Sequence, residues 1–350
     1  MTAGRAALCA LAALLACACV HAVPRGRRAT KCNGYRELCN RQYSNVTVVG
    51  THDSYAVGKL TDLGANQDVN VTMQLNDGVR ALQIQGHKSK TSDGGSGISL
   101  CHTDCSIMDG GSADSYLKDV SDWLQQNAND VVTIIVANND NLPATQWASA
   151  FRAAGLDKIA YTAKNPVPKK KWPTLQDMIS QGHRVVVFMD YKTDTNAVPY
   201  ILPEFKNMWE DPYDQTSQPF NCTADRFDGK TKNMMYLHNH FLDRESNIFG
   251  KKFEVPDTSK LNTTNSQNVV LSNVNKCANE HGSYPTVVLV DFYNAESGGV
   301  FKAAARMNNV KYKAKNLTMA DTSSSSNGVH AHLSPAAAVL GASALALVLA

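Results

Sequence analysis

Two histidines occupy positions in which they could work as an acid–base pair. His52 lies in the segment 50–55, directly after a short β-branched run, and His102 follows a second such run. Asp291 follows a third run, and Asp53 is the neighbour of His52. An imidazole takes a proton from a hydroxyl or gives one to a leaving oxygen, and a nearby carboxylate fixes its tautomer and tunes its pKa. These four residues predict proton-transfer chemistry.

The elements around these residues must bring them together. Apolar runs typical of strands cover residues 46–49, 79–84, 98–100, 131–136, 184–189, 234–237 and 286–290. Helical periodicity covers 113–126, 144–154, 174–181 and 300–308. This alternation predicts an α/β fold with parallel strands, either a (β/α) barrel or a doubly wound sheet. No glycine-rich nucleotide motif opens a helix, which favours the barrel, whose strand ends would meet at one mouth.

Several segments carry a family resemblance. Residues 50–55, 74–82, 100–102, 129–134 and 290–293 resemble, in type and order, the motifs of the phosphatidylinositol-specific phospholipase C X-domain-like phosphodiesterases. The resemblance covers residues 46–301, and residues 83–87 with the terminal signals are most similar to the secreted fungal branch. It implies a single-domain, distorted TIM-type barrel that cleaves phosphatidylinositol-type lipids through a cyclic phosphate. It assigns His52 as the base, oriented by Asp291, and His102 as the acid, assisted by Asp53.

One departure from the family pattern concerns the second strand. Family members place an acidic metal ligand or an arginine there, whereas this chain has Gln83 and Gln85. We therefore expect a metal-independent reaction without a cofactor. The alternative is a catalytically impaired barrel that binds inositol-phosphate or glycan ligands at the cell surface. The residues expected to contact the phosphate or the head group are Arg80, Gln85, His87, Lys88, Asn138, Asp190 and Tyr191.

Both ends of the chain carry processing signals. Residues 1–22 combine a basic start, an apolar run and a small-residue end, which is typical of a cleaved signal peptide. Residues 322–328 form a serine-rich stalk, and residues 329–350 an uncharged apolar tail, so we expect a glycolipid (GPI) anchor at Ser326 and removal of the tail. Uncleaved membrane helices are the alternatives. The barrel, residues 23–321, would then lie outside the cell, at the outer leaflet of the plasma membrane or in the cell wall.

Cysteine usage agrees with export. Of nine cysteines, three lie in the signal peptide, and the six that remain favour disulfides in an oxidising compartment. Local closure favours the pairs Cys32–Cys39 and Cys101–Cys105, which leaves Cys222–Cys277. A zinc site at residues 101–105 is the alternative, although no second Cys/His cluster accompanies it.

The remaining features describe the surface and the loops. A formal net charge of +3 without a basic stripe argues against nucleic acid as a partner, and we expect a monomer. The stretch 199–228, rich in Pro, Asp and aromatic residues, predicts a long loop, and His238 with His240 predicts a loop pair. Five sequons predict glycosylation, at Asn45, Asn70, Asn221, Asn262 and Asn316.

Overall fold

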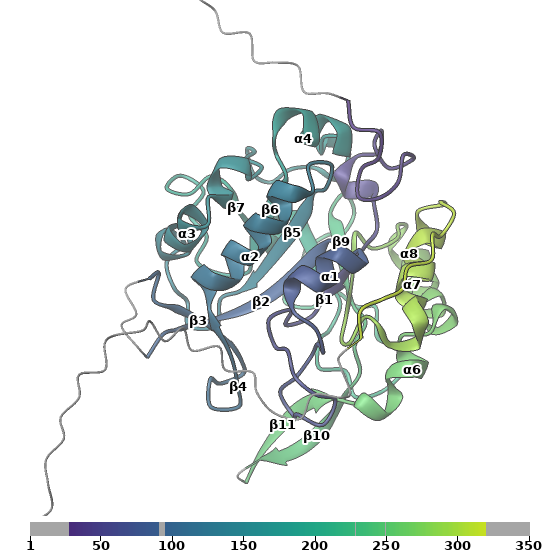
Figure 1. The fold of residues 1–350 in the computed structure, drawn as a ribbon. Helices are drawn as coiled ribbons and strands as arrows, with labels where there is room; N and C mark the ends of the chain where they lie inside the picture. Colours follow the sequence, from purple (N-terminus) through teal and green to yellow (C-terminus); the bar gives the residue numbers. More distant parts are fainter. Residues whose placement is uncertain (1–27, 91–94, 228, 249, 320–350) are drawn as a thin grey trace, which may run out of the picture. The chain divides into compact units, whose positions relative to one another are not determined.

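A curled parallel sheet forms the centre of the molecule. The computed structural model describes residues 28–90, 95–227, 229–248 and 250–319 (Figure 1). Eight parallel strands follow the order β7-β6-β5-β2-β1-β12-β9-β8, and in the described part of the chain the edge strands β7 and β8 do not pair. The strands are β1 (Val48–Thr51), β2 (Ala81–Lys88), β5 (Val132–Ala137), β6 (Val185–Met189), β7 (Ile201–Pro203), β8 (Met208–Glu210), β9 (Met235–Asn239) and β12 (Val287–Val290). This open, distorted TIM-type barrel confirms the predicted fold class.

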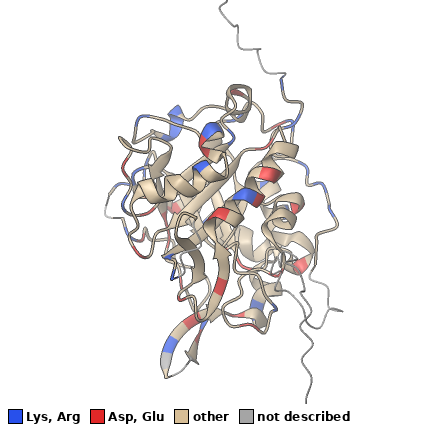
Figure 2. Ribbon diagram, turned by 60° about the vertical axis from the view of Figure 1, so that its left-hand side comes forward, with Lys and Arg blue, Asp and Glu red and all other residues tan. Residues whose placement is uncertain are grey.

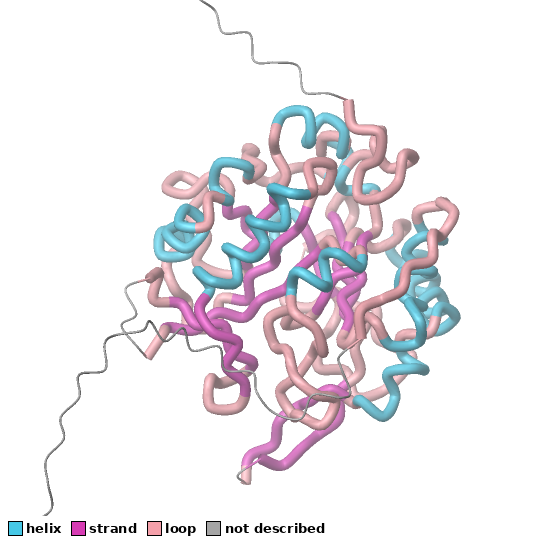
Figure 3. Tube along the Cα trace, viewed as in Figure 1, coloured by secondary structure: helices cyan, strands magenta, loops and turns pink. Residues whose placement is uncertain are grey.

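Helices cover the outside of the sheet (Figures 1 and 3). The helices are α1 (Val71–Asp77), α2 (Ala113–Gln126), α3 (Ala144–Ala153), α4 (Leu175–Gln181), α5 (Glu204–Asn207), α6 (Leu261–Thr264), α7 (Gln267–His281) and α8 (Gly299–Met307). The side chain of Ser112 accepts a hydrogen bond from the amide of Ser115 and so begins α2, whose buried face includes Leu117, Val120 and Leu124. Helices α2, α3, α4 and α8 thus correspond, within about two residues, to the predicted ones.

Strand alternation divides the core into two layers. Ile134 and Val136 of β5 pack outward, in one cluster with Leu117 of α2. Ile135 belongs to a second cluster with Phe188, Leu237 and Leu289. Because successive side chains of a strand point to opposite faces, a strand buried on both sides is apolar throughout. Gly50 keeps β1 close to β12, since a Cβ there would lie 2.8 Å from a methyl carbon of Val287.

Two strands outside the barrel bring His102 back to its mouth. Strand β2 extends beyond the barrel, and β3 (Ile98–His102) pairs with that extension in the antiparallel direction, followed by β4 (Met108–Ser112). The prediction that His102 ends a barrel strand is therefore wrong. Its position depends on the antiparallel return of β3 along β2.

The predicted long loop is also wrong in part. Residues 199–228 contain β7, α5 and β8, which are short strands and one helical turn. Three-residue strands give too little periodicity to be recognised in a sequence. His238 lies within β9, and His240 follows directly after it. A hairpin of β10 (Asp243–Ile248) and β11 (Lys251–Pro256) then extends from the barrel (Figure 1).

Three disulfides stabilise the chain. They join Cys32 to Cys39, Cys101 to Cys105 and Cys222 to Cys277, which is the pairing that the sequence favoured. The bond between Cys101 and Cys105 removes the two thiolates that the zinc alternative requires.

The surface fits the small net charge. Figure 2 shows Lys and Arg interspersed with Asp and Glu. All five sequon asparagines are exposed. No helix among the described residues is long and apolar enough to cross a membrane. The predicted signal peptide, the serine-rich stalk, the predicted anchor site Ser326 and the apolar tail lie outside the described residues.

Candidate active site

His52 is held by a buried carboxylate. It follows β1, and Asp291 follows β12, the strand that pairs with β1. The His52 Nδ1 atom lies 3.0 Å from Asp291 Oδ1. The side-chain amide of Asn66 donates to the same carboxylate oxygen at 3.0 Å. Since the carboxylate accepts from Nδ1, the Nε2 atom of His52 is the one left for chemistry.

His102 faces His52 across a second carboxylate. Its Nδ1 atom donates to the carbonyl oxygen of Gly64 at 2.9 Å, which also leaves Nε2 for chemistry. One oxygen of Asp53 lies 3.8 Å from His52 Nε2 and 3.7 Å from His102 Nε2. The two imidazole ring centres are 6.1 Å apart. This geometry brings together all four residues that the resemblance assigned to catalysis.

The electrostatic environment strongly favours the protonated form of His52. The pKa of His52 is raised from 6.5 to about 10: burial lowers it, but the charges of Asp291 and Asp53 and the hydrogen bond to Asp291 outweigh burial. Burial and the nearby charge of Asp291 raise the pKa of Asp243 to about 8. The ring of Phe241 stacks on His52 with ring centres 3.9 Å apart and so restricts the imidazole plane.

These side chains open into a cavity of about 300 Å³. Besides the two histidines and Asp53, its wall includes Gln83 and Gln85 of β2, Asp190 after β6, and Glu210 of β8. Pockets of roughly 300–1,000 Å³ hold small molecules, so the cavity suits a head group rather than a whole lipid.

Arg226 contributes a cation to the same cavity. It forms an ion pair with Glu210, and its guanidinium lies over the rings of Phe205 and Tyr213. Burial opposes its charge, but Glu210 and Glu204 raise the pKa of Arg226 further above its usual value. Burial and the neighbouring acids raise the pKa of Glu204 well above its usual range. The cavity therefore combines one guanidinium with several carboxyl groups.

The two glutamines hold the loops that carry the candidate catalytic histidines. The Gln83 side-chain oxygen accepts from the amide of Asp53 at 2.6 Å, and that of Gln85 accepts from the amide of Thr103 at 2.6 Å. Each glutamine thus fixes the backbone next to one of the two histidines. A glutamate would accept these bonds equally well, but it would add a negative charge beside a phosphate.

Other predicted contact residues lie elsewhere. Arg80 precedes β2, at the opposite end of the barrel, where its Nη2 atom pairs with Asp130 at 2.9 Å. His87 and Lys88 lie on the extension of β2 and bind Asp140 through a ring nitrogen and the backbone amide, respectively. Spacing along a strand does not reveal at which end of a barrel a side chain lies.

Of the predicted contact residues that follow β5 and β6, one lines the cavity and two do not. Asp190 lines the cavity, and its carboxylate accepts from the amides of Asn138 and Tyr191. The Asn138 side chain is buried and binds the backbone of Leu142, so it supports the loop. Tyr191 is 44% exposed and packs near Phe205, outside the cavity wall.

Sequence reasoning missed Asn66, Phe241 and Arg226. Phe241 follows a predicted strand, and that position could have indicated it. Asn66 and Arg226 lie in segments without periodicity, and nothing in the sequence relates them to the histidines.

A metal centre finds little support in these residues. Within the described ranges, the group of potential ligands that converges consists of Asp211, His238 and Cys277. Cys277 is bonded to Cys222, so its sulfur is not a thiolate ligand. The four residues of the histidine site do not form such a group.

Comparisons with known proteins point to one family. The family model PI-PLC X 1 matches residues 38–308. "PI-PLC X domain-containing protein 1" of Arthroderma benhamiae is 40% identical over 303 residues, 85% of this chain and 95% of that protein. An "uncharacterized secreted protein" of the same fungus is 38% identical over 305 residues, 83% of this chain and 67% of that protein.

Solved structures show the same fold at low sequence identity. The phosphatidylinositol-specific phospholipase C of Listeria monocytogenes superimposes with a TM-score of 0.50 and 15% identity, over 78% of this chain and 96% of that one. An enzyme of the same name from Staphylococcus aureus gives 0.50 and 14%, over 78% and 95%. With the match over residues 38–308, the chain belongs to the PI-PLC X-domain family.

Proposed function

We propose that the protein is an extracellular, metal-independent phosphodiesterase that acts on phosphatidylinositol-type lipid head groups. The observation that carries this proposal is the histidine pair: two imidazoles, each fixed through Nδ1, face each other with ring centres 6.1 Å apart. An acid and a base on opposite sides of a phosphodiester perform an in-line displacement.

The reaction proceeds in one displacement. His52 Nε2 takes the proton of the inositol 2-hydroxyl, and that oxygen forms a bond to phosphorus. The bond from phosphorus to the diacylglycerol oxygen breaks, and His102 Nε2 gives this oxygen a proton. The products are a cyclic phosphate and diacylglycerol. Asp291 stabilises the imidazolium of His52, and Asp53, whose carboxylate lies 3.7 Å from His102 Nε2, assists the acid.

Charge on the phosphate is stabilised without a metal ion. In the transition state the imidazolium formed on His52 stabilises this charge, and the carboxamides of Gln83 and Gln85 line the same cavity. Arg226 and its carboxylate partners suit the hydroxyl groups of an inositol ring, since together they offer both donors and acceptors.

The test uses the purified protein with phosphatidylinositol vesicles and a chelator. We expect cyclic inositol phosphate from the wild type and a loss of at least about 100-fold in His52→Ala and in His102→Ala, the size of a general acid–base contribution. Asp122→Asn, on the exposed face of α2, is the control. No product from the wild type, or equal turnover in His52→Ala, would overturn the proposal.

The alternative function is binding without turnover. It is motivated by Gln83 and Gln85, which stand where relatives in the family carry a charged residue. Calorimetry with inositol phosphate that shows binding while no cyclic phosphate forms would favour this alternative. Detection of cyclic phosphate would exclude it.

Export and anchoring complete the proposal. A similar fungal protein is described as secreted, and the three disulfides suit an oxidising compartment. We propose that the signal peptide is removed, that Ser326 carries the glycolipid anchor, and that the exposed sequon asparagines carry glycans. Mass spectrometry of the protein released from its native membrane would identify both ends and each glycan.

A further inference from the structure

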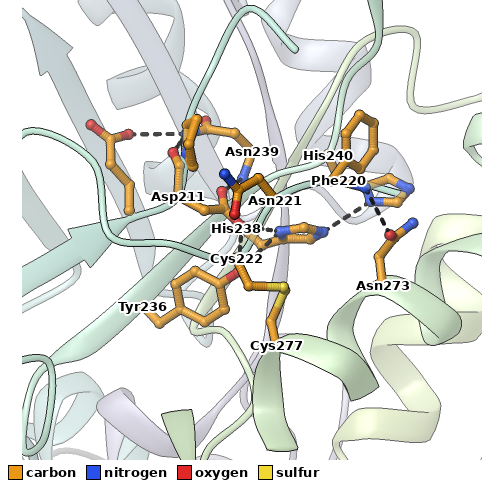
Figure 4. Close-up of polar contacts among 12 residues, drawn as sticks. Asp211, Phe220, Asn221, Cys222, Tyr236, His238, Asn239, His240, Asn273 and Cys277 are labelled. Atoms are coloured by element: carbon orange, nitrogen blue, oxygen red, sulfur yellow. Dashed lines mark hydrogen bonds and ion pairs between the residues drawn. A yellow bond between two sulfur atoms is a disulfide. The ribbon is translucent and has the colours of Figure 1, made fainter. Parts of the chain in front are cut away.

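A chain of buried polar groups lies behind the active site, in the layer between the barrel and α7 (Figure 4). Asp211, His238 and His240 are all 0% exposed. Asp211 follows β8, and the two histidines lie at the end of β9. The Asp211 carboxylate contacts His238 Nδ1, and His238 Nε2 lies 3.1 Å from His240 Nδ1. His240 Nε2 lies 2.9 Å from the carbonyl oxygen of Thr264.

A count of protons shows that this chain is charged. The chain has an acceptor at each end, the carboxylate of Asp211 and the carbonyl oxygen of Thr264. Its three hydrogen bonds, from Asp211 to His238, from His238 to His240 and from His240 to Thr264, each need one proton on a ring nitrogen or on the carboxyl group. Two neutral imidazoles supply only two. The third proton belongs to the imidazole and not to Asp211, because both oxygens of that carboxylate already accept hydrogen bonds, from the hydroxyl of Tyr236 and the amide of Asn239. His238 is therefore an imidazolium paired with the Asp211 carboxylate.

The neighbouring groups agree with this assignment. Burial and the charge of His238 lower the pKa of His240 to about 3, which keeps His240 neutral. Tyr236 also donates to Asp211, and burial with this carboxylate raises the pKa of its hydroxyl well above the usual value. The rings of Phe220 and His240 meet edge to face, with ring centres 5.0 Å apart.

Both ends of the chain connect to the active site. Asp211 accepts from the amide of Asn239 at 2.7 Å, and the Asn239 side chain donates to Glu210, the partner of Arg226. The Asp211 end of the chain therefore helps to hold the Glu210–Arg226 ion pair, which places the Arg226 guanidinium in the cavity.

The other end holds the catalytic dyad. Phe241, directly after His240, stacks on His52. Asn265, directly after Thr264, donates to the carbonyl oxygen of Asp291 at 2.8 Å. Residues on both sides of the contact between His240 and Thr264 thus touch the dyad.

We propose that Asp211, His238 and His240 form a charged positioning element that holds Arg226 and the His52–Asp291 dyad in one arrangement. These residues do not touch the substrate. Their effect on turnover rests on the proposed phosphodiesterase function, whereas their effect on His52 does not.

Three substitutions separate charge from connectivity. Asp211→Asn removes the charge and keeps all three hydrogen bonds. The side-chain amide of the asparagine donates to His238 Nδ1, so two neutral imidazoles supply the other two protons. His240→Gln keeps one acceptor and one donor. His240→Leu removes both and leaves a buried donor and a buried carbonyl without partners. Asp122→Asn is again the control.

The first readout is nitrogen NMR of the histidine rings, which needs no substrate. In the wild type we expect both ring nitrogens of His238 to carry protons, and in Asp211→Asn only Nε2. In His240→Leu we expect shifted signals from the His52 ring, and in His240→Gln signals close to those of the wild type. A singly protonated His238 in the wild type would overturn the proposal even if His240→Leu fails to fold.

The second readout is turnover of phosphatidylinositol vesicles. For His240→Leu we expect kcat to fall about 10- to 100-fold, the size of effect seen for outer partners of functional groups, with most of the loss restored in His240→Gln. A folded His240→Leu with wild-type kcat and wild-type His52 signals would show a structural role only and would overturn the proposal. If the wild type shows no turnover, the proposed function fails, and the NMR readout still decides the positioning role.

Discussion

Replacement of Asp291 by asparagine tests the electrostatic basis of the candidate site. The carboxylate accepts from His52 and Asn66 through Oδ1, while Oδ2 is buried without a partner. An asparagine with its amide at the Oδ2 position keeps both hydrogen bonds and removes only the charge. Asp291→Asn therefore separates geometry from electrostatics.

The magnitude follows from the geometry. Two unit charges about 4 Å apart interact by roughly 4 kcal/mol at an effective dielectric constant of about 20, which corresponds to about three pH units. The pKa of His52, raised to about 10 in the wild type, should therefore fall to about 7 in Asp291→Asn. If half to all of the imidazolium charge develops in the transition state, kcat measured at a pH where His52 is neutral in both proteins should fall between about 30- and 1,000-fold.

The assay follows the His52 ring by NMR as the pH is varied and measures turnover in parallel. The base must be neutral, so kcat/KM of the wild type should rise with pH towards the pKa of His52, and in Asp291→Asn this rise should end at lower pH. Asp122→Asn is the matched control, since this exposed carboxylate pairs with Lys118. A His52 that titrates identically in Asp291→Asn and the wild type would refute the reasoning.

Four further predictions concern stability and selectivity. The raised pKa values of Asp243 and His52 mean that the folded state binds protons more tightly than the unfolded state, so Tm should fall as the pH rises from about 4 to about 10. In Asp243→Asn the decrease of Tm below about pH 8 should be smaller. A Tm that rises over this range would contradict the reasoning. Loss of the Cys222–Cys277 bond, which spans 55 residues, should lower the free energy of unfolding by about 4 kcal/mol. Loss of the Cys101–Cys105 bond, which spans 4 residues, should lower it by about 2 kcal/mol. Urea unfolding of the two double-alanine variants measures both losses, and equal losses would contradict the dependence on loop length. Arg226→Met should lower the free energy of unfolding by about 3 kcal/mol, because Glu210 stays buried without its partner. Glu210→Gln added to this variant should restore stability but not turnover. If turnover also recovers, Arg226 does not contact the substrate. Phosphatidylinositol in vesicles should react at least about 10-fold faster than lipids whose inositol carries further phosphates, because acidic side chains of the cavity wall would repel those phosphates. These side chains are Asp190, Glu204, Glu210, Asp214 and Glu254. The opposite preference would show that they do not face the inositol ring.

Local patterns were sufficient for most of the barrel. Strands such as β5 and β6 are buried on both faces, so their sequences are continuous apolar runs, and α2 shows one apolar face at helical spacing. The two disulfides that close over 7 and 4 residues follow from proximity in the chain, which leaves one pairing for the last two cysteines. The edge strands β7 and β8 were missed because three residues contain no readable period.

The sequence by itself determined the order of the barrel elements and the family, and its motifs predicted that His52, Asp53 and Asp291 belong to one site. These depend on local burial patterns and on motifs at strand ends, which a chain expresses residue by residue. Tertiary structure alone decided that Arg226 enters the cavity, that Arg80 lies at the opposite end, and that Phe241 stacks on His52. The contact between His52 and Asp291 spans 239 residues, and such contacts arise only when the curled sheet brings distant loops to one mouth. The same closure buries Asp211, His238 and His240 together, where their burial from solvent makes the number of protons they share decisive.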